Sequence, residues 1–211
     1  LDAGGNNRPP LSVAVKMMPA LTRTEDREAF DRELSAHMLA ARNCDGVCVL
    51  HGTCEKEQRL CIVMKRYERS LADQIASGPL DVSAVRRYGH SLFRTLRQLH
   101  EMNPPIIVQD IKPANIFLSS NGSIKLGDLG LGRAFSSQTY EALSKEGTPL
   151  YMSPEVLDGR GYEWKSDVWS LGCLLYELAC LRSPFKAAGD SLYTLFKKIS
   201  AGEYAALPSH F

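Results

Sequence analysis

Two oxygen-bearing side chains flank a predicted β-hairpin. Asn121-Gly122 is typical of a two-residue type I′ turn, because both central residues of that turn need positive φ. With the turn centred there, Asn115 lies opposite Asp128 at the open end of the hairpin. An amide oxygen and a carboxylate are hard oxygen ligands of the kind that Mg²⁺ binds, so a magnesium site is one interpretation. The other is that the two residues only cap the hairpin.

Further charged residues stand at fixed places relative to this pair. Asp110 precedes Asn115 by five residues, Lys16 ends the strand-like run 13–16, and Glu155 ends a Ser-Pro-Glu run further along. Val-Ala-Val-Lys, Asp-Ile-Lys-Pro-Ala-Asn, Asp-Leu-Gly and Ser-Pro-Glu follow one another in this chain. The series resembles the eukaryotic protein-kinase motifs V-A-I-K, D-x-x-x-x-N, D-F-G and A-P-E. The resemblance covers essentially the whole chain and implies ATP-dependent phosphoryl transfer.

The second half of the chain resembles one group of kinases in particular. KLGDLGLGRAFSS, GTPLYMSPE and KSDVWSLGCLLYELACLRSPF are similar to the NIMA-related serine/threonine kinases. Asp110 and Lys112, followed by Thr148, form the serine/threonine type of pattern rather than the tyrosine type. The implied partner is therefore a protein substrate with a serine or threonine hydroxyl, and the implied cofactors are ATP and Mg²⁺.

The resemblance assigns roles around the transferred phosphoryl group, whose charge must be neutralised and held in line. Asp110 is implied to accept the proton of the substrate hydroxyl, and Lys112 to steady the transferring phosphate. Asn115 and Asp128 are implied to hold Mg²⁺.

The same resemblance implies that Lys16 contacts the α- and β-phosphates and that Glu33 holds it. Glu33 falls at the edge of the apolar stripe of a predicted helix, where a carboxylate can point inward beside the core. Glu25 and Glu28 are rival partners, and Glu33 could instead be a solvated residue of the helix face. We predict that Lys16 and Glu33 lie within ion-pair distance in an active-like structure.

A binding site for adenine is also implied. Met64 matches the position behind the base, and Lys65 to Tyr67 match the hinge that offers backbone groups to it. Ala14 above and Phe117 below could sandwich the ring. These apolar residues could equally be ordinary core, and both readings can hold at once.

Hydrophobic periodicity predicts the elements that must position these groups. We expect strands at 12–16 and 60–64 and amphipathic helices at 25–41 and 82–100. A helix at 165–179 is apolar on nearly all sides, so we expect it to be buried, with Asp167 anchoring the backbone of the catalytic loop.

The order of these elements favours an α+β fold with two lobes. Strands and one helix come first and mostly helices follow. The predicted division is a kinase-like small lobe at 1–66 and a large lobe at 67–211.

Some residues depart from the kinase pattern. Val108-Gln109 stand where the family has His-Arg, and His37, four residues after Glu33, stands where it has an aliphatic residue. A polar ring at that place is either satisfied by a neighbour or points elsewhere. These departures support an alternative function, a pseudokinase that acts as a binding or scaffold domain.

Other expectations concern the ends of the chain and its control. The glycine-rich loop is expected before residue 1 and the last helices after Phe211, so this piece alone should be a poor catalyst, with Glu155 lacking a basic partner. Ser144 matches the activation phosphosite of the NIMA-related pattern. Neutral Gln109 cannot pair with a phosphate as Arg does, and Arg133 and Lys145 lie off the catalytic loop. Phosphorylation of Ser144 should therefore stimulate kinase activity only weakly. The sequence does not identify a regulatory partner.

Composition sets broad limits. The 211 residues carry a formal net charge of +1 and are 44% hydrophobic, which is typical of a globular domain and gives no indication of nucleic-acid or membrane binding. Four of the six cysteines fall in one stretch, and the spacing of Cys44, Cys48, Cys54 and Cys61 does not fit a zinc site well. Free thiols suit a reducing compartment, so we expect an intracellular, cytoplasmic protein.

Overall fold

The computed structural model describes residues 12–18, 24–57, 59–129 and 149–211. The sequence predictions that concern Arg133, Ser144, Lys145 and Thr148 fall outside these residues.

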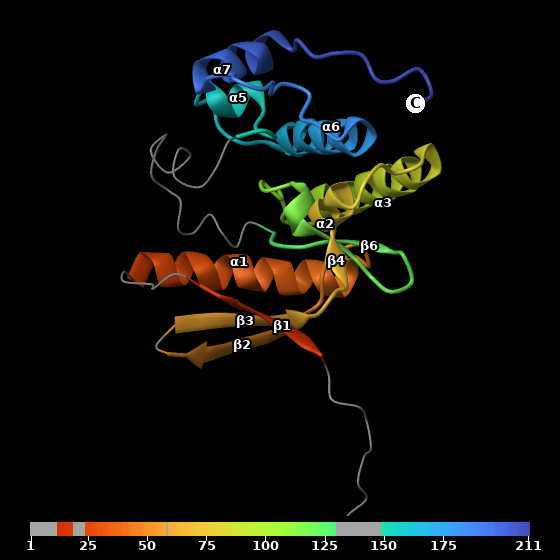
Figure 1. Ribbon diagram of the computed structural model, residues 1–211. Coiled ribbons are helices and arrows are strands. Elements are labelled where there is room, and N and C mark those ends of the chain that lie inside the picture. The colour runs from red at the N-terminus through yellow and green to blue at the C-terminus, as the bar shows by residue number, and fades with distance from the viewer. Residues whose placement is uncertain (1–11, 19–23, 58, 130–148) are drawn as a thin grey trace, which may run out of the picture.

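The first part of the described chain is a small sheet covered by one long helix (Figure 1). The sheet has the strand order β1-β3-β2 and is antiparallel, and the helix α1 lies along it. The elements are β1 (Val13–Met17), α1 (Thr24–Asn43), β2 (Leu50–Lys56) and β3 (Arg59–Lys65). The predicted strands and helix are confirmed, whereas β2 was not predicted.

The remaining elements are mainly helical. In Figure 1, α2 and α3 adjoin a second small sheet of order β4-β5-β6, and α5, α6 and α7 form the far end of the molecule. The elements are β4 (Arg69–Ser70), α2 (Leu71–Ala76), α3 (Val82–His100), the 3-10 helix η1 (Pro113–Asn115), β5 (Ile116–Leu118), β6 (Ile124–Leu126), α5 (Pro154–Leu157), α6 (Trp164–Cys180) and α7 (Leu192–Ala201). The mixed, two-part architecture is that expected of an α+β kinase-like fold.

Burial follows the predicted periodicity. Phe30 and His37 of α1 are fully buried, as are Leu99 of α3 and Leu174 of α6. One large core joins α3, α6 and the β5-β6 hairpin, and a smaller core lies between α1 and the first sheet. Helix α6 is less enclosed than predicted, since Val168 on one side of it is 38% exposed.

The hairpin between β5 and β6 does not have the predicted turn. Ser119 N donates to Ser123 O, and Gly122 N donates to Ser119 O. Of the two predicted turn residues only Gly122 has positive φ, at 76°. The loop therefore has three residues, a turn followed by a left-handed residue. The side chain of Asn121 stabilises this loop, because its Oδ1 accepts hydrogen bonds from Ser123 N and Ser119 Oγ at 3.0 Å each.

This turn shifts the register by one residue. Phe117 pairs with Lys125, and Gly127 N donates to Asn115 O at 2.8 Å. The prediction that Asn115 lies opposite Asp128 was wrong, because the added loop residue places Gly127 there instead.

The hairpin is attached to the segment after α1 by close backbone contacts at Gly46. Leu126 N donates to Gly46 O at 2.7 Å, and a Cβ added at Gly46 would lie 1.8 Å from Thr95 Oγ1 of α3. We expect Gly46→Ala to lower the free energy of unfolding by about 1–3 kcal/mol or more, since overpacking forces neighbouring groups apart. Denaturant unfolding measures the change.

The matched control is Gly172→Ala. Gly172 lies in α6, and a Cβ added there meets nothing within 4 Å, so alanine should stabilise the helix by up to about 1 kcal/mol. Equal changes in the free energy of unfolding for the two substitutions would contradict the close packing at Gly46.

Candidate active site

The segment before η1 is held in place by one buried carboxylate. Asp167 of α6 is 0% exposed. It accepts hydrogen bonds from Val108 N and Gln109 N, both at 2.9 Å, from Tyr162 Oη at 3.0 Å, and it lies 2.8 Å from His100 Nε2. The predicted anchoring of this backbone by Asp167 is confirmed.

Gln109 adopts a left-handed conformation at this anchor, with φ of 67°. Such a conformation is costly for a residue with a Cβ and persists where its surroundings enforce it. The two adjacent amides bound to Asp167 supply that enforcement, and Asp110 follows directly.

Asp110, Lys112 and Asn115 form one contact group. Asp110 Oδ2 accepts from Asn115 Nδ2 at 2.6 Å and pairs with Lys112 Nζ at 2.9 Å. Asn115 Nδ2 also lies 3.0 Å from Asp110 O. The Asp110 side chain stays 45% exposed, so a substrate can reach a carboxylate whose orientation is fixed by two neighbours.

Lys16 is paired with a different carboxylate from the one predicted. Its Nζ lies 2.7 Å from Asp128 Oδ2, with side-chain exposures of 37% and 17%. The predicted ion pair with Glu33 was for an active-like structure, whereas in this structure the carboxylate within ion-pair distance of Lys16 is that of Asp128. Asp128 has φ of 49°, directly after the hairpin, which places its carboxylate within reach of strand β1.

Two oxygen donors remain suited to a divalent cation. The amide nitrogen of Asn115 is bound to Asp110, so its amide oxygen is the group left to act as a ligand. Asp128 supplies a carboxylate. Proteins often bind Mg²⁺ through one or two such groups together with phosphate oxygens, so these residues fit the cation. In the described residues no group of three or more His, Cys, Asp or Glu side chains could hold a metal ion.

The residues expected around adenine come from both sheets. Ala14 and Met64 are cross-strand partners in β1 and β3, and Met64 is 9% exposed. Phe117 of β5 stacks on Tyr67, with ring centroids 5.8 Å apart and planes at 17°.

The segment that follows β3 is tied to its neighbours. Lys65 N donates to Val49 O at 2.9 Å, and Tyr67 Oη accepts from Val49 N at 3.3 Å. Burial raises the pKa of Tyr67 to about 12, so its hydroxyl stays protonated at neutral pH. The Lys65 ammonium lies 5.8 Å from the Tyr67 ring centroid.

His37 is satisfied inside the core. Its Nε2 lies 3.0 Å from Cys48 O, and Leu129 N donates to its Nδ1 at 3.4 Å. The sequence marked His37 as an unusual residue at an apolar position, but its two backbone partners lie far from it in the chain and carried no signal.

Glu155 also has a partner that sequence reasoning missed. It is partly buried, and the Ser166 hydroxyl donates to its Oε1. Burial raises the pKa of Glu155 and the hydrogen bond from Ser166 lowers it, with a net downward shift. The sequence predicted that Glu155 lacks a basic partner, and the partner found here is a neutral donor supplied by α6.

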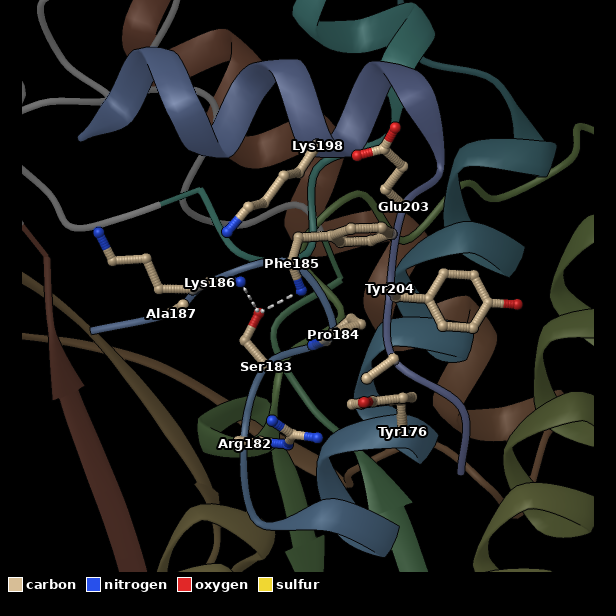
Figure 2. A pocket seen from close by; sticks show the side chains of 11 residues that line it. Tyr176, Arg182, Ser183, Pro184, Phe185, Lys186, Ala187, Lys198, Glu203 and Tyr204 are labelled. Carbon is tan, nitrogen blue, oxygen red and sulfur yellow. Dashed lines mark hydrogen bonds between the residues drawn. The ribbon is translucent and has the colours of Figure 1, made fainter. Parts of the chain in front are cut away.

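A separate cavity of about 350 Å³ lies between the end of α6, α7 and the segment after α7. Figure 2 shows Phe185, Tyr204 and Tyr176 beside it, with Arg182 and Lys186 at its margin. Phe185 stacks on Trp169 at 5.5 Å between centroids. None of the residues around the cavity belongs to the candidate site.

All six cysteines are free thiols. Burial raises the pKa of Cys48 to about 12, so this thiol is protonated and unreactive at neutral pH. Among the helices that the structure describes, none has the length and apolar character to cross a membrane.

Comparison with known proteins gives consistent matches. A family model described as protein kinase domain matches residues 6–203. The human serine/threonine-protein kinase Nek2 is 39% identical over 161 residues, which is 72% of this chain and 36% of that protein. Human serine/threonine-protein kinase Nek11 is 31% identical over 190 residues, covering 87% and 29%.

A third relative is the G2-specific protein kinase nim-1 of Neurospora crassa. It is 46% identical over 104 residues, 49% of this chain and 12% of that protein. The predicted similarity to NIMA-related kinases is thereby confirmed, and the chain spans about a third or less of the length of these relatives.

Proposed function

From the fact that this chain belongs to the protein kinase domain family, we propose that the protein transfers the γ-phosphoryl group of ATP to serine or threonine hydroxyls of a protein substrate. One observation carries the proposal. Asp110 is partly exposed and is oriented by both Lys112 and Asn115, on a backbone fixed to the buried Asp167.

Asp110 is the proposed acceptor for the hydroxyl proton of the substrate. A general base must lie within hydrogen-bond reach of the proton it takes, and the contacts to Lys112 and Asn115 hold its carboxylate in one orientation. When the substrate hydroxyl attacks the γ-phosphorus, its proton passes to Asp110 and the bond to the β-phosphate oxygen breaks. Lys112 supplies positive charge next to the transferring group.

On the nucleotide side, we assign the α- and β-phosphates to Lys16. The ion pair between Lys16 and Asp128, at 2.7 Å, brings a cation and a carboxylate together where we place the phosphates. Asn115 and Asp128 would hold Mg²⁺, which neutralises phosphate charge during transfer. Glu33 stays a proposed partner of Lys16 only for a conformation in which Lys16 leaves Asp128.

For the base, we assign the space between Ala14 and Phe117, beside Met64. Lys65 N is already bound to Val49 O, so the backbone N–H of Tyr67 is our proposed hinge donor. Tyr67 has a second proposed role. Its ring stacks on Phe117 and so supports the residue that we place below the adenine, the floor of the site.

Gly127 provides a test of this floor. A Cβ added there would lie 2.6 Å from Phe117 Cε2, which is too close, so alanine must displace the ring. We expect Gly127→Ala to weaken ATP binding roughly tenfold, because overpacking costs about 1–3 kcal/mol. A titration with ATP, followed by protein fluorescence, measures the affinity. Gly172→Ala, where a Cβ meets nothing, should bind ATP as the unchanged protein does. Unaltered affinity in Gly127→Ala would remove Phe117 from the base site.

We also propose a cytoplasmic location. Six free thiols are the state expected of cysteines in a reducing compartment. Microscopy of the tagged full-length protein tests this, and secretion into the medium would contradict it.

The experiment for the function is phosphate transfer from γ-labelled ATP to a generic protein substrate by the full-length protein. Label should appear on phosphoserine and phosphothreonine after acid hydrolysis. Label on phosphotyrosine alone would overturn the assigned specificity. ATP binding without any transfer would instead support the scaffold function. We expect transfer, because Lys16, Asp110, Asn115 and Asp128 are all retained and are needed together only for chemistry.

A further inference from the structure

His37 connects three segments that are far apart in the chain. It belongs to α1 and is 0% exposed. One ring nitrogen lies 3.0 Å from Cys48 O, just before β2, and the other accepts from Leu129 N, directly after Asp128, at 3.4 Å. The residue thus joins α1 to the backbone on which the Asp128 carboxylate depends.

The two partners determine the protonation pattern of the ring. A carbonyl can only accept a hydrogen bond, so Nε2 must carry the hydrogen that faces Cys48 O. A backbone amide can only donate, so Nδ1 must present its lone pair to Leu129 N. Only the neutral imidazole with hydrogen on Nε2 satisfies both groups. Burial lowers the pKa of His37, which agrees with a neutral ring.

The Cys48 backbone is itself fixed to the hairpin. Cys48 N donates to Leu126 O at 2.8 Å, and Leu126 N donates to Gly46 O at 2.7 Å. The short segment from Leu126 to Leu129 is therefore held at one end through Cys48 and at the other through His37. Asp128, with φ of 49°, lies between these two attachments.

A left-handed conformation at a residue with a Cβ persists only where the surrounding structure enforces it. An aliphatic side chain in place of His37 could fill space, but it would leave Leu129 N and Cys48 O without this partner inside the core. Leu129 is 4% exposed and Cys48 is 1% exposed, so water could not readily replace the bonds.

We propose that His37 is a positioning residue that orients Asp128 through the hydrogen bond from Leu129 N to its ring. The proposal deepens the proposed function and rests on it for its kinetic consequences. Its structural content, a neutral ring bridging Cys48 and Leu129, stands apart from catalysis and can be tested separately.

The first measurement is the ¹⁵N NMR spectrum of the His37 ring in the unchanged protein at neutral pH. We expect hydrogen on Nε2 and a lone pair on Nδ1. Hydrogen on Nδ1 would overturn the proposal, because Leu129 N could not then donate to that atom. This result does not depend on any variant folding or on kinase activity.

The second measurement compares His37→Leu with His37→Gln by hydrogen exchange at the Leu129 amide. Leucine removes both bonds, whereas the glutamine amide can donate to Cys48 O and accept from Leu129 N. We expect exchange roughly tenfold faster in His37→Leu, the effect of losing about one hydrogen bond, and close to unchanged in His37→Gln. The Leu126 amide, bound to Gly46 O, is the internal reference and should stay protected in both.

The third measurement is the Mg²⁺ concentration that gives half-maximal phosphate transfer. It should rise roughly tenfold in His37→Leu and return toward the original value in His37→Gln, since a misplaced Asp128 binds the cation less well. A smaller folded fraction would lower the rate without changing this concentration. Unaltered Leu129 exchange and Mg²⁺ dependence in folded His37→Leu would overturn the proposal. If the unchanged protein transfers no phosphate, the proposed function fails, while the NMR and exchange results still decide the role of His37.

Discussion

Replacement of Asp110 by asparagine is expected to lower kcat by about 10²–10⁴-fold, the usual contribution of a positioned general base. Asparagine keeps the size of the side chain and can still contact Lys112 and Asn115, but it cannot take the substrate proton. The Asp110 carboxylate is 45% exposed and contacts Lys112 and Asn115, neither of which is assigned to the adenine, so the affinity for ATP should change little. Steady-state phosphate transfer and a separate nucleotide titration measure the two quantities.

The matched control for this prediction is Asp158→Asn. Asp158 is also a partly exposed carboxylate, paired with Arg160 at 2.8 Å with 51% of its side chain exposed, but it lies outside the candidate site. Its replacement should leave kcat unchanged. If Asp110→Asn retained most of the activity while the control did too, the proton would have to go to another group, and the assigned mechanism would be wrong.

Loss of the Asp167 carboxylate is expected to have the largest effect on stability. Val108 N, Gln109 N, Tyr162 Oη and His100 Nε2 all depend on it, and the residue is fully buried. Removing one partner of a buried charged cluster costs about 3–5 kcal/mol, a large share of the 5–15 kcal/mol by which domains are usually stable. We therefore expect Asp167→Ala to reduce the free energy of unfolding by about that amount in a urea titration.

Asp158→Ala provides the comparison. It removes the surface ion pair with Arg160, whose length of 2.8 Å equals the distance between Asp167 and His100. Exposed pairs contribute about 0–1 kcal/mol, so its unfolding midpoint should barely move. Hydrogen exchange at Val108 and Gln109 adds a local readout, and both amides should lose protection in Asp167→Ala. A variant that unfolds like the unchanged protein would contradict the anchoring role of Asp167.

Much of the fold followed from local patterns in the sequence. The period of the apolar residues located α1, α3 and α6, because a helix repeats every 3.6 residues whatever it packs against. Apolar strand-like runs located β1 and β3 in the same way. Strand β2 was missed because its residues, Leu50–Lys56, are mostly exposed and carry little apolar pattern.

The kinase motifs also predicted which residues matter, and Asp110, Lys112 and Asn115 do lie together. They are close in the chain, so one short helical turn brings them into contact. The hairpin register was harder. Asn121 and Gly122 suit two kinds of turn, and the side-chain bonds of Asn121 to Ser123 and Ser119 accompany the longer one.

The partners of isolated charged and polar groups were decided only by the tertiary structure. Lys16 could reach several carboxylates, and the one it pairs with, Asp128, lies 112 residues away. The hydrogen bonds of Glu155 with Ser166 and of His37 with Leu129 also depend on the tertiary structure. Residue type determines that a buried polar group needs a partner, but which atom meets that need depends on how separate segments pack, and spacing in the sequence does not encode it.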